Sequence, residues 1–307
     1  MDAPTLDTRV ADSAPSRTAK GLWGSIIAQL IVMAGCLVLI YPTAAGWFSD
    51  RNHNNEVTGY TESISHITVT ERSEILKVAD DYNSRLPQGP LRDPYTHGEQ
   101  DATEESAAYQ LYESMLAVSE SGVIGHIIYP SLGIDLPVYH GTSDEVISKG
   151  AGHLYGSSLP VGGPSTHAVL TAHSGMAKAR LFTALPKATE DQIFTVDVLG
   201  EKHWYRVDQI KSVLPNDTDS LQIIKGEDYV TLITCTPIGV NSHRLLVRGI
   251  RIPPPEDEQK LLESDPILAG FPWWAVIFVG VSATSAYFLF VPPRRKQEQP
   301  QETPKRT

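Results

Sequence analysis

The segment Tyr229-Val230-Thr231-Leu232-Ile233-Thr234-Cys235 decides the fold of this chain, and Thr236-Pro237 follows it directly. Its residues are mostly apolar, aromatic or β-branched, which are the types that favour a strand. A thiol at the end of such a strand is held by the sheet while its far side stays open. We therefore expect a buried strand that presents Cys235 at its end.

Short runs of the same kind surround this segment, separated by Gly, Pro, Asn and Asp. They are Val123–Tyr129, Leu136–Tyr139, His167–His173, Ile193–Leu199, Trp204–Val213 and Leu245–Ile252. Leu181–Leu185 is expected to form a short helix, and Pro253-Pro254-Pro255 ends the last strand because proline cannot donate to a ladder. Many short strands at close spacing predict a mostly β fold, a barrel or a sandwich.

Two helices are expected upstream of the strands, at residues 56–86 and 101–118. Apolar side chains recur there at helical spacing. They are Ile75, Val78, Ala79, Tyr82 and Leu86 in the first helix, and Ala108, Leu111, Tyr112 and Met115 in the second. The stretch from Leu86 to Gly98 is rich in helix breakers and is expected to be a loop.

Two apolar runs flank all of these elements. No Asp, Glu, Lys or Arg occurs from Gly21 to Ser49 or from Pro266 to Pro293. Each run exceeds the roughly 20 residues that cross a membrane as a helix. We expect a membrane helix from each, although a cleaved signal peptide is an alternative for the first.

Charge sets the expected orientation and excludes one class of partner. Basic residues precede the first run and follow the second, and such residues favour the cytoplasmic side. Residues 50–265 should then lie outside the cell, where 31 acidic and 17 basic side chains give them a net charge of −14. This charge argues against nucleic acid as a partner. It suits a cationic partner such as a lysine-bearing surface, or serves only for solvation.

The chain has two cysteines, Cys36 and Cys235. Cys36 lies within the first apolar run, so the two cannot plausibly form a disulfide. An unpaired thiol is unusual in an exported domain, because oxidising compartments favour disulfides. Cys235 is therefore either a reactive thiol or a buried residue that packs as a small hydrophobe.

His173 and Arg244 are the residues that could make Cys235 reactive. His173 follows the run Val169–Ala172, and Arg244 begins the last strand. An imidazolium lowers the pKa of a nearby thiol and can protonate a departing amine. An arginine can stabilise an oxyanion. Taken singly, each also fits a plain strand-end histidine or a surface arginine.

A family resemblance joins the three residues. Thr231-Leu232-Ile233-Thr234-Cys235, with Arg244 nine residues on, resembles the TLxTC…R signature of sortases, and Thr171-Ala172-His173-Ser174-Gly175 resembles their histidine motif. The resemblance runs over most of residues 120–252. It implies a closed β-barrel and a cysteine transpeptidase that cleaves an LPxTG-like sorting signal between Thr and Gly. Cys235, His173 and Arg244 would be the catalytic residues, with no cofactor.

The stretch before the barrel resembles class C sortases, which polymerise pilins. Asp93-Pro94-Tyr95 resembles their lid, and this implies that Asp93 pairs with Arg244 and that Tyr95 covers Cys235. A simple turn is the alternative, since Asp-Pro commonly starts one. Two positions depart from the family pattern: Ala172 stands where glycine is frequent, and Tyr95 replaces the commoner Phe or Trp.

These observations give a complete expected organisation. It comprises a cytoplasmic tail (1–20), a transmembrane helix or signal anchor (21–48), a helical region with the lid loop Asp93–Tyr95 (49–120), the barrel (121–255), a linker (256–266), a transmembrane helix (267–292) and a basic cytoplasmic tail (293–307). The expected partners are the membrane and pilins with LPxTG-like signals and acceptor lysines. Thr234 is a weaker candidate for substrate binding.

Three alternatives stay open. A housekeeping sortase, which attaches proteins to peptidoglycan, would use the same site with another nucleophile. A membrane-tethered scaffold would carry an inert Cys235. The scattered histidines lack tight metal-ligand spacing, although a zinc site remains conceivable; they are His126, His140, His153, His167, His203 and His243. His243 could be mistaken for a catalytic base, but strand alternation points it away from the face of Arg244.

Overall fold

The computed structural model describes residues 19–87, 91–95, 106–256 and 270–291. The described residues form two compact units, one from within residues 1–41 and 273–307 and the other from within 42–272. Helix α1 (Ala19–Ser65) contributes to both units. The expected tails 1–20 and 293–307 and the linker 256–266 lie almost wholly outside the described residues.

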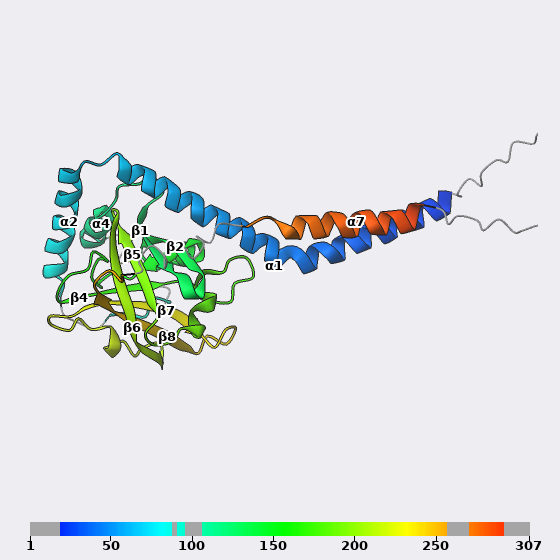
Figure 1. Cartoon of the computed structure of the whole chain (residues 1–307). Coiled ribbons are helices and arrows are strands. Elements are labelled where there is room, and N and C mark those ends of the chain that lie inside the picture. Colours follow the sequence, from blue (N-terminus) through cyan, green and yellow to red (C-terminus); the bar gives the residue numbers. More distant parts are fainter. Residues whose placement is uncertain (1–18, 88–90, 96–105, 257–269, 292–307) are drawn as a thin grey trace, which may run out of the picture. The chain divides into compact units, whose positions relative to one another are not determined.

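The first unit pairs the beginning of α1 with helix α7 (Trp273–Phe290), and Figure 1 shows the two side by side. The Gln29 amide donates to the carbonyl of Ser282 (3.2 Å) and accepts from the hydroxyl of Ser285 (2.9 Å). Polar contacts of this kind fix how two apolar helices align, because the surrounding side chains offer no directional bonds.

Two described helices are long and apolar enough to cross a membrane, Leu22–Ser65 and Trp273–Phe290. Helix α1 also continues well past residue 48, where the first apolar run was expected to end, and reaches Ser65. Its polar second half belongs to the second unit.

The helical region upstream of the barrel differs from the single helix expected at residues 56–86. Helix α1 ends at Ser65 and α2 (Val69–Ser84) begins after Thr68. The Thr68 hydroxyl accepts from the Glu71 amide and the Glu71 carboxylate accepts from the Thr68 amide, which is a capping box. Helix α4 (Ala107–Ser114) falls within the expected 101–118, of which residues 101–105 lie outside the described part.

Eight strands close into a barrel in the order β1-β2-β3-β4-β7-β8-β6-β5 (Figure 1). Their bounds are β1 Val123–Tyr129, β2 Ile134–His140, β3 Ala151–His153, β4 Thr166–Thr171, β5 Ile193–Val198, β6 Glu201–Val213, β7 Asp228–Thr236 and β8 His243–Ile252. Pairs β2/β3 and β4/β7 are parallel, and the others are antiparallel. The expected mostly β fold is confirmed, and it is the barrel.

Short helices connect the strands of the barrel. They are η1 (Pro130–Leu132), α5 (Asp144–Lys149), η2 (Leu181–Lys187) and η3 (Asp219–Leu221). The expected short helix at Leu181–Leu185 corresponds to η2. Helix α5, between β2 and β3, was not expected. It lies beside His173, which follows the end of β4.

Strand β7 is buried on both sides, and the two sides pack against different groups. Val230 and Leu232 point into the main core inside the barrel. Ile233 points the other way, into a small cluster with Val169 and Leu246 on the neighbouring strands β4 and β8. We call this second side the outer face. Leu91 and Tyr95, from the segment that follows α2, pack on the outer face.

Two side chains fasten the upstream helices to the barrel. The Tyr60 hydroxyl of α1 donates to the Ile124 carbonyl (3.1 Å) and accepts from the Leu199 amide (2.8 Å). The Asn83 amide of α2 donates to the Leu159 carbonyl (3.1 Å) and accepts from the Leu159 amide (2.7 Å). The end of α2 is therefore anchored a few residues before Leu91 begins to cover the outer face.

Candidate active site

The strand register brings His173, Cys235 and Arg244 to one edge of the sheet. Strands β4 and β7 are parallel, with Thr171 opposite Ile233, so His173 and Cys235 each follow two residues later. Strands β7 and β8 are antiparallel, with Cys235 directly opposite Arg244. Residues two apart share a face of a strand. All three therefore belong to the outer face, although they are far apart in the sequence.

Cys235 is buried, with 8% of its surface exposed. Burial raises the pKa of the Cys235 thiol, because a charged thiolate loses its hydration there. The Arg244 charge lowers this pKa, the Asp93 charge raises it, and a hydrogen bond from Tyr95 lowers it. The closed arrangement therefore favours the neutral thiol, which is the less nucleophilic form.

Arg244 is held by Asp93 through two parallel hydrogen bonds. Its Nε donates to Oδ1 (2.8 Å) and its Nη2 donates to Oδ2 (2.7 Å). The Asp93 side chain is only 2% exposed and that of Arg244 only 11%. A fork-to-carboxylate pair of this kind is the geometry in which arginine also binds a substrate carboxylate or oxyanion. Asp93 thus fills the place on Arg244 that a substrate would need.

Tyr95 lies between the candidate catalytic side chains. Its ring is 4.8 Å from the guanidinium carbon of Arg244, and its centroid is 6.0 Å from that of the His173 ring. Its hydroxyl donates to the Ala172 carbonyl (2.9 Å) and accepts from the Thr171 hydroxyl (2.7 Å). Burial raises the pKa of this phenol, so it stays neutral.

The segment Leu91–Tyr95 therefore covers the site in this structure. Leu91 packs against the backbone at Gly156, where an added Cβ would lie 3.3 Å from the Leu91 side chain. Residues 94 and 95 form a turn, so the turn and lid interpretations describe the same segment. Cys235 is buried on the face that this segment covers.

The remaining site candidates have internal contacts. Thr234 is fully buried, and its hydroxyl donates to the Ala172 carbonyl (2.9 Å). Ala172, the departure from glycine, is also fully buried and supplies that carbonyl to both Thr234 and Tyr95. His243 bonds to the neighbouring Ser242 hydroxyl (2.9 Å), on the opposite side of β8 from Arg244.

Sequence reasoning missed the residues that support the site. The Ser174 hydroxyl donates to the Cys235 carbonyl (2.8 Å) and so ties the end of β4 to β7. Asp144 at the start of α5 lies 3.5 Å from the His173 ring. The sequence signal for α5 was Ser143, a residue type that begins helices, but nothing in the sequence placed that helix beside His173.

Three of the other histidines have hydrogen-bond partners of their own, away from Cys235. His126 pairs with Asp135. His153 bonds to the Tyr112 hydroxyl (2.8 Å), and burial lowers the pKa of His153 to about 4. His167 bonds to the Thr231 hydroxyl (2.7 Å). Among the described residues, no group of three or more His, Cys, Asp or Glu side chains is arranged to hold a metal ion.

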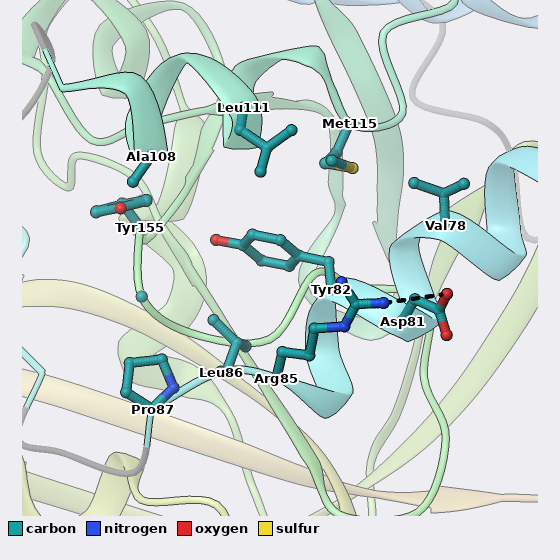
Figure 2. Close-up of a pocket in the computed structure, with 11 residues that line it drawn as sticks. Val78, Asp81, Tyr82, Arg85, Leu86, Pro87, Ala108, Leu111, Met115 and Tyr155 are labelled. Atoms are coloured by element: carbon teal, nitrogen blue, oxygen red, sulfur yellow. Dashed lines mark ion pairs between the residues drawn. The ribbon is translucent and has the colours of Figure 1, made fainter.

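A pocket of about 610 Å³ lies between α2, α4 and the loop after β3. Figure 2 shows Tyr82 in its middle, with Leu111 and Met115 on one side and Leu86 on the other. The Asp81–Arg85 ion pair (3.6 Å) lies at its edge. None of the three candidate catalytic residues lines this pocket, so it is not the place where the thiol acts.

The arrangement supports one kind of chemistry. A strand-end thiol, an imidazole and an arginine fork are together on the outer face, and they are the groups that acyl transfer through a thioester requires. Comparison with known proteins agrees. The family described as Sortase domain matches residues 127–252, which covers β8 to its end and includes all three residues.

Many solved structures resemble this chain, including the following three. Sortase C-1 from Actinomyces oris is 43% identical, with 59% of this chain and 98% of that chain covered and a TM-score of 0.56. Streptococcus pneumoniae sortase C, described for its catalysis and pilin substrate specificity, is 41% identical, with 65% and 97% covered and a TM-score of 0.59. Corynebacterium diphtheriae sortase A is 38% identical, with 68% and 97% covered and a TM-score of 0.61.

Curated relatives match more weakly. Proteins named Sortase A from Streptococcus agalactiae and Bacillus anthracis are 28% and 29% identical over 118 and 136 residues. The matches cover 37% and 43% of this chain, and 47% and 61% of the two relatives. The chain thus spans about half of the length of the curated relatives it matches.

Proposed function

This chain belongs to the sortase family of cysteine transpeptidases, and we propose that it is a class C member that joins pilin subunits. The observation that carries the proposal is the covered site: Asp93 occupies the Arg244 fork and Tyr95 lies against the Cys235 thiol. The similar sortase C structures from Actinomyces oris and Streptococcus pneumoniae support the same class.

The first half of the proposed reaction forms a thioester. We call the segment Leu91–Tyr95 the lid segment. After it moves, the Cys235 thiolate attacks the threonine carbonyl of an LPxTG-like sorting signal. Arg244 donates to the resulting oxyanion. The threonine–glycine amide bond then breaks, and His173 as imidazolium gives its proton to the departing glycine amine. The threonine remains bound to the Cys235 sulfur as a thioester.

The second half transfers the acyl group. A lysine amine of another pilin subunit attacks the thioester, neutral His173 accepts a proton from that amine, and the Cys235 thiolate leaves. The product is an isopeptide bond between two pilins. The net charge of −14 on residues 50–265 suits a lysine-bearing acceptor. Thr234, the weaker candidate, would act through the Ala172 backbone that it holds.

We further propose that α1 and α7 anchor the enzyme in the membrane, with both termini in the cytoplasm and the barrel outside. The two apolar helices and the basic residues beyond them support this orientation. A sortase must meet secreted substrates and surface polymers, and an external barrel allows this.

The test is mass spectrometry of the intact full-length chain in detergent micelles, incubated with an LPxTG-type peptide. We expect an acyl adduct on Cys235 that is stronger in the Asp93→Ala/Tyr95→Ala double variant. The Cys235→Ala variant should form none. A folded protein that forms no adduct in any version would refute the proposal and favour the inert scaffold.

A housekeeping sortase is the second candidate, because the curated relatives and the Corynebacterium diphtheriae structure carry the name sortase A. The two functions share the thioester and differ in the amine that resolves it. Once the adduct has formed, it should be offered a lysine-bearing pilin peptide or a peptidoglycan cross-bridge amine. Faster release by the lysine peptide supports pilin polymerisation, and faster release by the cross-bridge amine supports the housekeeping function.

A further inference from the structure

Helix α5 (Asp144–Lys149) is packed beside His173. The Ile147 carbonyl of α5 accepts a hydrogen bond from the His173 amide (3.4 Å), and Ile147 is fully buried. The Ser143 hydroxyl accepts from the Val146 amide and so fixes where the helix begins. Asp144 precedes Ile147 by three residues, which puts both on the same side of the helix.

Asp144 directs its carboxylate at the His173 ring. Its Oδ1 lies 3.5 Å from Nε2 of His173. Among the described residues, the other charged or titratable groups near this ring include Tyr95 from the segment Leu91–Tyr95 and Cys235 at the matching position of β7. Arg244 of β8 follows beyond Tyr95, and its charge is paired with Asp93.

From this geometry we propose that Asp144 is a positioning residue, which orients His173 and stabilises its protonated ring during transpeptidation. The inference rests on the function proposed above, because only a reacting His173 needs such support. Asp144 extends the site from the three residues of the signature to a fourth.

The physical argument is electrostatic. A carboxylate close to imidazole favours the charged ring, and removing it makes the ring lose its proton at lower pH. Asp144 is 64% exposed and His173 is 25% exposed, so water screens part of the attraction. We therefore expect a shift of about half a pH unit, which corresponds to about a threefold change in the protonated fraction.

The test compares Asp144→Asn with Asp144→Glu and Glu145→Gln in the full-length chain in detergent micelles. Glu145 is the matched control: it carries the same charge on the same turn, but points about 100° away around the helix. The first measurement is an NMR titration of ¹³C-labelled histidine, with the His173 signal assigned from a His173→Gln variant. It requires no peptide. The second is the rate of the Cys235 acyl adduct as a function of pH.

We expect Asp144→Asn to lower the His173 titration midpoint by about half a unit and the adduct rate about threefold. In the plot of the adduct rate against pH, the part of the curve in which His173 loses its proton should shift to lower pH by the same amount. Asp144→Glu should restore most of both values, and Glu145→Gln should change neither. Near-ultraviolet circular dichroism checks that each variant is folded.

The alternative outcomes separate the two proposals. If the wild type forms the adduct but the midpoint does not move in Asp144→Asn, the role of Asp144 is refuted while the transpeptidase stands. If Glu145→Gln moves the midpoint equally, the effect is general charge and the specific role is also refuted. If neither the wild type nor the Asp93→Ala/Tyr95→Ala variant forms an adduct, the transpeptidase fails, and the role of Asp144 fails with it.

Discussion

Asp93 influences Cys235 in two separate ways. It occupies the donors of Arg244, which a substrate oxyanion would otherwise use. Its charge also raises the pKa of the thiol and opposes the effect of Arg244. Because both effects end when the carboxylate leaves, moving the lid segment should both open the site and create the nucleophile.

The variant Asp93→Ala tests this at a single residue. Burial raises the Cys235 pKa most, and removing the carboxylate takes away the second cause that raises it, so that only burial still opposes the lowering effect of Arg244. The pKa should therefore fall, so that more thiolate is present at neutral pH. Alkylation by a small thiol reagent at pH 7 should accelerate about tenfold for each unit of the fall. The plot of the alkylation rate of Asp93→Ala against pH should shift to lower pH relative to the wild type.

The matched control is Asp81→Ala, which removes an exposed carboxylate from α2 and should leave the rate unchanged. Equal rates in Asp93→Ala and the wild type, with both proteins folded, would show that Asp93 does not control the thiol.

The Tyr95 hydroxyl holds the lid in a way that phenylalanine cannot. It bonds to the Ala172 carbonyl and the Thr171 hydroxyl, both in the barrel wall. In Tyr95→Phe the ring still shields the thiol, but the two hydrogen bonds of the hydroxyl are lost, at about 1 kcal/mol each. The Ala172 carbonyl keeps its bond from Thr234, and the Thr171 hydroxyl keeps its bond to the Ile233 carbonyl. Alkylation of Cys235 should be faster than in the wild type and slower than in Tyr95→Ala. If Cys235 is alkylated at the same rate in Tyr95→Phe as in the wild type, the ring of Tyr95 shields the thiol and its hydroxyl does not contribute.

The signature residues could be found from the sequence because His173, Cys235 and Arg244 each lie at a strand end within a recognisable pattern. Asp144 could not, since its contact with His173 spans 29 positions and depends on where α5 packs. Thr171 was visible only as part of the histidine motif. Its bond to Tyr95 requires a lid segment from another part of the chain.

At the level of elements, the strands were predictable where buried runs are long. Strand β7 is buried along nearly all of its length, which explains its continuous apolar sequence. Strand β3 has only three residues, Ala151–His153, and carries no pattern. The break between α1 and α2 was missed because the apolar series that predicted this helix, Ile75 to Leu86, lies wholly after the break and carries no signal for it. Thr68 and Glu71 cap a new helix there.

A substitution of Asn83 tests how strongly the end of α2 is attached to the barrel, ahead of the segment Leu91–Tyr95. Its side chain satisfies both backbone groups of Leu159, which is fully buried. Asn83→Ala leaves the buried Leu159 amide without its partner, at a cost of about 2 kcal/mol in the free energy of unfolding. The Leu159 carbonyl loses one of two hydrogen bonds and keeps the one from the Val161 amide (2.8 Å). Urea denaturation of the full chain in detergent micelles measures this value.

The neighbouring Ser84 supplies the control, because its exposed hydroxyl bonds only locally to the Asp81 carbonyl. Ser84→Ala should change the free energy of unfolding by less than about 0.5 kcal/mol. If Asn83→Ala changes the free energy of unfolding as little as Ser84→Ala does, the hydrogen bonds between Asn83 and Leu159 do not stabilise the fold.

At the scale of the whole molecule, the described residues divide into an apolar helix pair and a barrel unit, and the membrane anchor that we propose would account for this division. The first unit exposes large apolar side chains, among them Leu39, Val38 and Phe288, which water would not favour. The second unit carries the acidic charge, and its candidate active site is on the barrel. A chain divided in this way is expected to hold its chemistry at the membrane surface.

The orientation of the chain can be measured in cells that express it. In a background of Cys36→Ala and Cys235→Ala, we expect Ser84→Cys to react with a membrane-impermeant maleimide in intact cells. Thr303→Cys should react only after permeabilisation, since the basic tail favours the cytoplasm. Labelling of Thr303→Cys in intact cells would place the C-terminus outside. The intact mass of the same protein decides the N-terminus, because cleavage of a signal peptide would remove the first apolar run and leave α7 as the single anchor.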